Sequence, residues 1–289
     1  MLDTWSHECG EPERTPNLAR ALTGARPGEA RVWLTLARAL VEPADLPERL
    51  AAVERALALD KRLTEAWDLK AEVLAVAERF DEAIQACQDG AAAGTHAVYL
   101  LRGRHAWIEA RRRQLPEAIR LMRAVLAENA SYDWGWNLLA QWLAEQEALP
   151  EAATALEHLL RLRPHDAWPQ RQLGFLRLRQ DDLAGARTAF AAALRLEPTD
   201  VAAAQNLLDL QLRADDLAGA ADTLRVMQTH QPGAATLAAE VMLRLREGGD
   251  RVPLKALTSL CASPDPDPWP VEAAASAMQR AGQSPDALR

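Results

Sequence analysis

The chain has 289 residues, of which 49% are hydrophobic and only 5% aromatic, and its formal net charge is −8. Abundant Ala, Leu and Arg favour helices and disfavour a sheet, and the acidic balance argues against general nucleic-acid binding, which needs a basic face. No window approaches the roughly 18 apolar residues of a membrane span. The first residues do not resemble a secretory signal. The three cysteines lie far apart in the sequence and imply no disulfide framework. We therefore expect a cytoplasmic protein with no nucleic-acid partner and no membrane insertion.

Internal repetition is the strongest pattern in the chain, and its period is 34 residues. Four independent series share this interval: DDLAGA at 181–186 and 215–220, LPEA at 115–118 and 149–152, the prolines Pro164, Pro198 and Pro232, and the tryptophans Trp33 and Trp67. Such a period is typical of repeat proteins, in which each repeat is one supersecondary unit.

Each repeat reads as a helix, a tight turn and a second helix. In 167–200, apolar and small residues recur at helical spacing in both halves. Asp182 stands where a polar residue would cap the second helix, and Pro198 stands just past its end. One helix pair cannot bury its apolar face alone, so stability requires stacked neighbours.

In chain order, the period predicts a partial repeat at 2–29, whose second helix covers 14–24, then seven repeats, then a partial repeat or capping helix at 269–289. The seven repeats are 30–63, 64–97, 99–132, 133–166, 167–200, 201–234 and 235–268. The last is degenerate, since GGDR replaces its turn; SPDPDPWP at 263–270 should be a stiff link, and 271–282 should be helical. Arg49 replaces the usual alanine of the second helix in the first repeat, which we expect to pack less tightly.

The pattern resembles the tetratricopeptide repeat. Places are counted from the first residue of each repeat. Trp falls at place 4 of three repeats, a small residue at place 8, Ala at place 20 and Pro at place 32. The matching residues are Trp33, Trp67 and Trp136; Ala37, Ala71, Ala106, Ala140 and Gly174; Ala83, Ala118, Ala152, Ala186 and Ala220; and Pro27, Pro164, Pro198 and Pro232. The resemblance implies an all-α, right-handed α-solenoid of stacked antiparallel helix pairs across nearly the whole chain.

In a helix, places 2, 5, 9 and 12 share one face, here called the first-helix face. By the resemblance, this face of each first helix lines a concave groove where ligands lie. In repeat 64–97 the face carries an acidic band of Glu65, Asp68 and Glu72, whereas the next three repeats place aromatic and basic residues on or beside it. The candidate binding residues are Arg104, Trp107, Arg111, Trp134, Asn137, Gln141, Trp168, Arg171, Phe175 and Arg179.

Tryptophan and arginine dominate binding hot spots, and an exposed aromatic cluster usually marks an interaction site. We therefore expect a protein or peptide partner with apolar or aromatic anchors and some acidic character. The alternative is that these tryptophans pack against neighbouring helices and only broaden the core.

The sequence offers no constellation that would support catalysis, such as HExxH, CxxC, a phosphate loop or GxSxG. The group His7, Glu8 and Cys9 could suggest a metal or thiol site, but we interpret it as a frayed chain end. Cys87 is interpreted as a small buried hydrophobe. The acid pairs at 181–182 and 215–216 read as helix caps. We expect no enzyme activity, no cofactor and no metal.

Two classes of function remain open. The first is an interaction scaffold that binds a partner in its groove. The second is the non-catalytic repeat portion of a larger bacterial enzyme or of a secretion or assembly component; short runs at 64–74 and 133–142 also resemble the helical repeats of protein prenyltransferase α subunits. Self-association through the incomplete terminal repeats is a further hypothesis.

Overall fold

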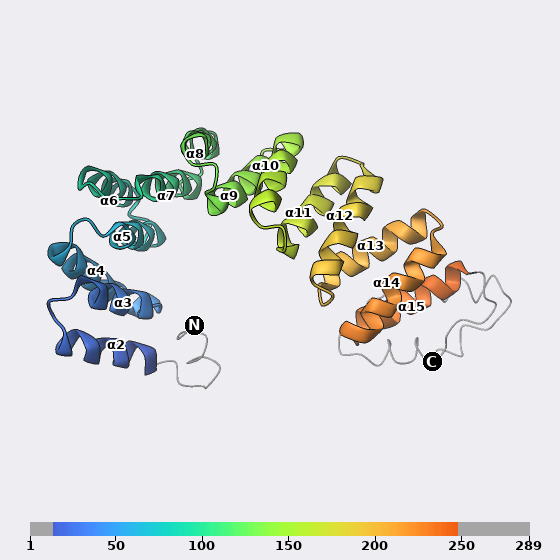
Figure 1. The fold of residues 1–289 in the computed structure, drawn as a ribbon, viewed down its shortest axis with the longest axis horizontal. Coiled ribbons are helices and arrows are strands. Elements are labelled where there is room, and N and C mark those ends of the chain that lie inside the picture. Colours follow the sequence, from blue (N-terminus) through green and yellow to red (C-terminus); the bar gives the residue numbers. More distant parts are fainter. Residues whose placement is uncertain (1–13, 248–289) are drawn as a thin grey trace. The chain divides into compact units, whose positions relative to one another are not determined.

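The computed structural model describes residues 14–247, which contain helices and no strand. The all-α class is therefore confirmed (Figure 1). The helices are α2 (Arg14–Ala25), α3 (Ala30–Ala39), α4 (Leu46–Leu59), α5 (Thr64–Val76), α6 (Phe80–Ala92), α7 (Val98–Arg111), α8 (Leu115–Glu128), α9 (Asp133–Glu145), α10 (Leu149–Leu162), α11 (Ala167–Arg179), α12 (Leu183–Leu196), α13 (Val201–Arg213), α14 (Leu217–His230) and α15 (Ala234–Arg246), with a 3₁₀ turn η1 at Pro43–Asp45.

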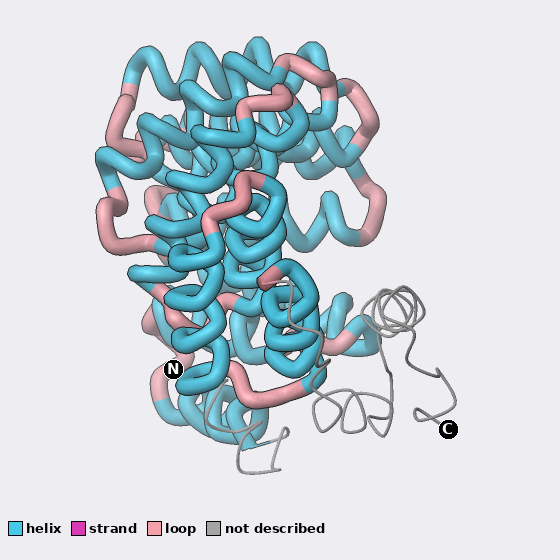
Figure 2. The backbone as a smooth tube through the Cα atoms, turned by 90° about the vertical axis from the view of Figure 1, so that its right-hand side faces the viewer, coloured by secondary structure: helices cyan, strands magenta, loops and turns pink. Residues whose placement is uncertain are grey.

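The chain divides into two compact modules, module 1 (Met1–Trp142) and module 2 (Leu143–Arg289), and the boundary falls within α9. Within each module, consecutive helices pack against each other, as α5 does on α6 and α11 does on α12. First helices of neighbouring repeats also touch, α5 against α7 and α13 against α15. Short loops join the helices (Figure 2).

Small residues set how closely the two helices of a repeat approach. The alanines at place 20 are completely buried in all five repeats from 64–97 to 201–234. Because a methyl group keeps the helix axes close, large neighbours can interdigitate around it. The structure describes neither the predicted link at 263–270, nor the helix at 271–282, nor the group His7, Glu8 and Cys9, all of which lie outside residues 14–247.

The tryptophans at place 4 connect each repeat to the loop before it. The indole Nε1 of Trp33 donates to the carbonyl of Pro27 at 2.9 Å, and Trp67 donates to Lys61 at 2.8 Å. Trp136 repeats the bond to Ala130 at 2.8 Å. Each indole thus buries part of its ring and satisfies its only donor, as partly buried tryptophans usually do.

The first repeat departs from the others because α3 ends early, at Ala39, and η1 follows. The Ala37 carbonyl, near the C-terminal end of α3, accepts a hydrogen bond from Nε of Arg49 at 3.0 Å. A cation is favourable at a helix C-terminus, where carbonyls lack backbone partners. The arginine at place 20 therefore caps the shortened helix, and Leu40, Val53 and Ala56 beside it are completely buried.

The turn inside each repeat from 64–97 to 201–234 uses one residue in the left-handed region, and none of these residues is glycine. The positive φ angles belong to Glu78, Arg113, Glu147, Asp181 and Asp215. In repeat 99–132, the amide of Arg113 donates to the Ala110 carbonyl, and Gln114 donates to Glu109, both at 2.9 Å. This is the Schellman ending of a helix.

The sequence-based assignment of both acids in each pair as caps was therefore wrong for the first acid. Asp181 and Asp215 are the left-handed turn residues, at φ 59° and 56°. The second acids are the caps: Asp182 accepts from the Gly185 amide at 2.8 Å, and Asp216 accepts from Gly219 at 3.0 Å.

We expect Arg113→Gly to stabilise the chain by about 0.5–1 kcal/mol. A left-handed non-glycine residue costs roughly 1–2 kcal/mol, which outweighs the ~0.5–1 kcal/mol of extra chain entropy that glycine loses. Asp181→Gly is the matched control and should gain less, because aspartate tolerates this conformation better. Urea unfolding of the intact chain measures both, and a destabilised Arg113→Gly variant would contradict the turn geometry.

Repeat 167–200 has a smaller residue than the other repeats at place 8, Gly174, and a larger one at place 24, Phe190. Phe190 fills the core completely buried, and a Cβ added to Gly174 would lie 2.6 Å from its ring. In other repeats with alanine at place 8, place 24 carries a smaller side chain, such as Cys87 with Ala71 or Met122 with Ala106. The missing methyl group of Gly174 thus makes room for the phenylalanine.

We expect Gly174→Ala to destabilise the chain by roughly 1–2 kcal/mol, since overpacking costs about 1–3 kcal/mol and exceeds the gain in helix propensity. In a Phe190→Leu background the same change should become neutral or stabilising. Thermal unfolding of the four variants measures the coupling, and an equal cost in both backgrounds would show that the ring does not set the size of residue 174.

Candidate binding surface on the first helices

The ten candidate residues all lie on first helices, namely α7, α9 and α11. Six are in module 1 and four are in module 2, so each module is described by itself. Arg111, Gln141 and Arg179 are exposed, and the other seven are half-buried.

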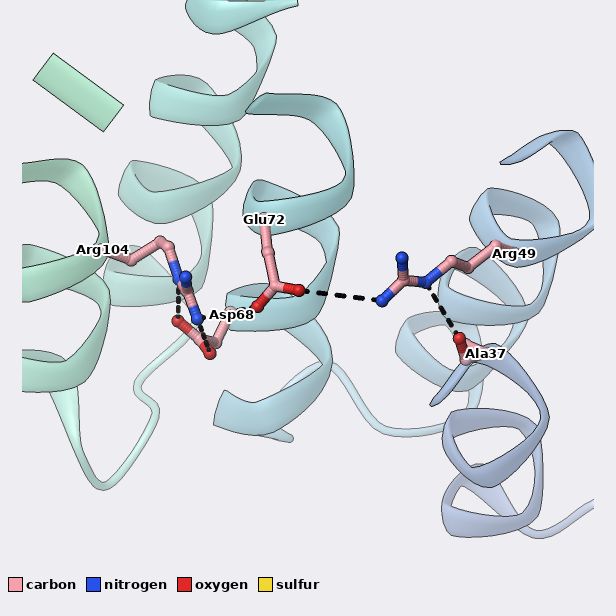
Figure 3. A network of polar contacts seen from close by, with 5 residues as sticks. All are labelled: Ala37, Arg49, Asp68, Glu72 and Arg104. Atoms are coloured by element: carbon pink, nitrogen blue, oxygen red, sulfur yellow. Dashed lines mark hydrogen bonds and ion pairs between the residues drawn. The ribbon is translucent and has the colours of Figure 1, made fainter. Parts of the chain in front are cut away.

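Arg104 of α7 is the centre of a polar network in module 1. Its guanidinium donates to both carboxylate oxygens of Asp68 on α5, at 2.8 and 2.9 Å, and lies 3.0 Å from Glu72. The other oxygen of Glu72 lies 3.7 Å from Arg49. Figure 3 shows the resulting chain of contacts from α7 through α5 to the Ala37 carbonyl of α3.

The network holds a nearly buried cation in its charged form. The Arg104 side chain is only 12% exposed. Burial lowers the pKa of this guanidinium, but the hydrogen bond to Asp68 and the charges of Asp68 and Glu72 outweigh that effect and raise the pKa overall. The bidentate geometry is the one in which arginine binds carboxylate best.

The same guanidinium lies between two indole rings. Its central carbon is 4.9 Å from the ring centre of Trp107 and 5.2 Å from that of Trp134. Arg111 stacks on Trp107 as well, at 5.3 Å. We call Arg111, Trp107, Arg104 and Trp134 the aromatic stack; cation–π contacts of this kind strengthen when the cation is desolvated.

Tyr132 supports the stack from the loop before α9. Its ring centre lies 5.8 Å from that of Trp134 and 5.3 Å from that of Tyr99. Added Cβ atoms at Gly103 and Gly135 would both come within 2.7 Å of the Tyr132 ring, so only glycine leaves room for it. Burial raises the pKa of Tyr132, which keeps the phenol neutral.

Asn137 and Gln141 follow Trp134 along α9 at helical spacing. The Gln141 amide nitrogen donates to the Asn137 side-chain oxygen. The pair therefore presents amide groups that are already oriented by each other beside the aromatic stack.

In module 2, the candidate residues are tied into the fold more fully. Arg171 lies 2.9 Å from Asp200, whose other oxygen caps α13 by accepting from Ala203. Phe175 packs edge-on against Phe190, with ring centres 5.2 Å apart. Arg179 donates to the Ala144 carbonyl and pairs with Glu147, both at 2.8 Å.

Trp168 is the remaining candidate of module 2 and is half-buried in the first turn of α11. Its backbone amide donates to the side chain of Asp166, the cap of that helix, at 3.0 Å. The cap fixes the position from which the indole projects.

Sequence reasoning treated Asp68 and Glu72 as an acidic band for a ligand and did not pair them with Arg104. The signal was present, because place 5 of one first helix and place 6 of the next carry opposite charges. Trp142, at place 10 of repeat 133–166, lies off the first-helix face, and the structure buries it to 6% exposure.

The described residues hold no group of three or more metal-ligating side chains. Cys87 is buried, and its burial raises the pKa of the thiol to about 12, so it carries no reactive thiolate near neutral pH. None of the helices in the part of the chain that the structure describes is long and apolar enough to cross a membrane.

Comparisons with solved structures identify the fold. The C-terminal part of a TPR repeat-containing protein from Cytophaga hutchinsonii aligns with a TM-score of 0.63 and 14% identity, over 85% of this chain and 99% of that one. A chain of the APC/C hetero-tetramer Cut9–Hcn1 aligns with a TM-score of 0.52 and 17% identity, over 83% of this chain and 47% of that one. No protein-family model and no curated protein matches the sequence.

The chain therefore has the tetratricopeptide-repeat fold, as the period and the residues at places 4, 8, 20 and 32 indicate. The likeness at this level of identity concerns the fold, and function is argued from the surface itself.

We expect Arg104→Gln to destabilise module 1 by roughly 3 kcal/mol, because removing one partner leaves Asp68 and Glu72 unpaired in a poorly hydrated site. Arg102→Gln on the same helix is the matched control: Arg102 pairs with Glu128 on the surface, where such pairs contribute at most about 1 kcal/mol. Urea unfolding followed by tryptophan fluorescence compares the two, and equal, small losses would contradict the assigned role of Arg104.

Proposed function

We propose that the chain is a non-catalytic scaffold that binds a protein or peptide through the first-helix face of module 1. The observation that carries the proposal is the aromatic stack, in which one nearly buried guanidinium holds two half-buried indoles in place. Rigid aromatic side chains lose little entropy on binding and dominate hot spots.

The partner should offer apolar or aromatic anchors to Trp107 and Trp134. Its acidic character should be met by Arg111, since Arg104, Arg171 and Arg179 are engaged by carboxylates or a carbonyl of the chain itself. Among the four candidate arginines, Arg111 is the one with no acidic partner among the described residues, and its stacking on Trp107 orients it for a bidentate contact.

The alternative is that the two indoles only enlarge the core. Trp107 does pack against the buried cluster of α5 to α7, and both rings shield Arg104 from water. Neither ring is completely buried, so part of each indole stays accessible to a partner, which supports the binding function.

We expect the double variant Trp107→Leu plus Trp134→Leu to lose partner binding by roughly thirtyfold or more, the loss that corresponds to a hot spot of about 2 kcal/mol. Immobilised wild type and variants are compared by quantitative capture from lysate, followed by titration with the recovered partner. Arg111→Gln should weaken binding less and reduce its dependence on salt.

Arg55→Gln is the matched control, since Arg55 is exposed on α4, a second helix of the same module. Circular dichroism establishes that each variant keeps its helices. Recovery of the same proteins at equal yield by wild type and the double tryptophan variant would overturn the proposal.

A further inference from the structure

A hollow of about 400 Å³ lies between α13 and α15 in module 2. These two first helices pack side by side (Figure 1). The lining residues are Gln205, Leu208, Asp209, Leu212, Arg213, Ala235, Ala238, Ala239, Met242 and Arg246. Its volume falls within the range of small-molecule sites, and its wall is mainly apolar with few polar groups.

Small side chains make up most of the α15 wall of the hollow. Ala238 stands at place 4, which is occupied by tryptophan in three earlier repeats. Ala235, three residues before Ala238, and Ala239, one residue after it, line the same wall.

One end of the hollow is basic. Because α14 reverses the chain between them, α13 and α15 run in the same direction, and Arg213 and Arg246 both stand in their last turns. Asp209 pairs with Arg213 at 2.8 Å. Arg246 has no acidic partner among the described residues, so the lining residues at this end carry one more positive than negative charge.

We propose that this hollow binds one apolar side chain of a partner peptide that carries a carboxylate beside it. The apolar group lies on the alanines, Met242 adapts its flexible side chain to the shape of the group, and Arg246 pairs with the carboxylate. The site is independent of the aromatic stack, because it belongs to the other module and uses none of the same residues.

The test uses the full chain with ¹³C-labelled methionine methyl groups and N-acetyl-leucine, the smallest probe with both features. Met242 lines the hollow, whereas Met122 and Met227 are completely buried and serve as internal controls. We expect the Met242 methyl signal to shift saturably with a dissociation constant in the low millimolar range, which suits a ligand of about 12 heavy atoms. The signals of Met122 and Met227 should stay in place.

N-acetyl-leucinamide keeps the apolar group and removes the charge, so it should bind at least threefold more weakly. Arg246→Gln should abolish this preference for the acid, and Arg195→Gln, an equal charge change on the exposed side of α12, should retain it. Ala235→Leu, which fills part of the hollow, should weaken both probes.

Three results would overturn the proposal. The first is a Met242 methyl signal that does not shift at the highest probe concentration. This result counts against the proposal even if its cause is that another part of the chain already fills the hollow. The second is equal binding of acid and amide by the wild type. The third is an acid preference that survives Arg246→Gln.

Discussion

The ion pair between Arg104 and Asp68 is the interaction on which the proposed surface of module 1 depends. A guanidinium that is only 12% exposed would be costly if it stood alone, and two carboxylates from α5 offset its charge. Once it is held there, its two flat faces are available to Trp107 and Trp134. The pairing of two neighbouring first helices therefore also determines where the indoles lie. Asp68 and Glu72 of the acidic band serve the fold first, and a ligand meets what that pairing leaves exposed.

The repeats tolerate such local specialisation because their framework is redundant. Completely buried alanines at place 20 and left-handed turns at place 15 recur with the period, so each helix pair is positioned by its neighbours. The first repeat shows how a departure is absorbed, since Arg49 both caps the shortened α3 and approaches Glu72 of the network. At the other end of the described chain, three alanines of α15 line a hollow between α13 and α15.

The period of 34 residues predicted the helical class and the small core residues, because these depend on spacing along one chain segment. Opposite charges at place 5 of one first helix and place 6 of the next marked Asp68 and Arg104 as possible partners, but the pairing itself depends on how neighbouring helices are rotated about their axes. For the same reason, the spacing does not indicate that Trp142, at place 10, is buried. The prediction that both acids of each pair are caps was wrong for a local reason. Composition alone does not say which of Asp181 and Asp182 adopts the left-handed conformation. Within the candidate surface, residue types were predictable from the sequence, but the charge that remains available to a partner was not.

The most direct measurement of the central claim is a double-mutant cycle between Arg104→Gln and Asp68→Asn, read from urea unfolding of the intact chain. If the guanidinium and the carboxylate stabilise each other, the two changes together should cost less than the sum of the single changes, by roughly 1–3 kcal/mol. The fluorescence of the double variant should also change, because the indoles lose the cation between them. Additive costs with unchanged fluorescence would contradict the account, since the ion pair would then hold neither the helices nor the rings.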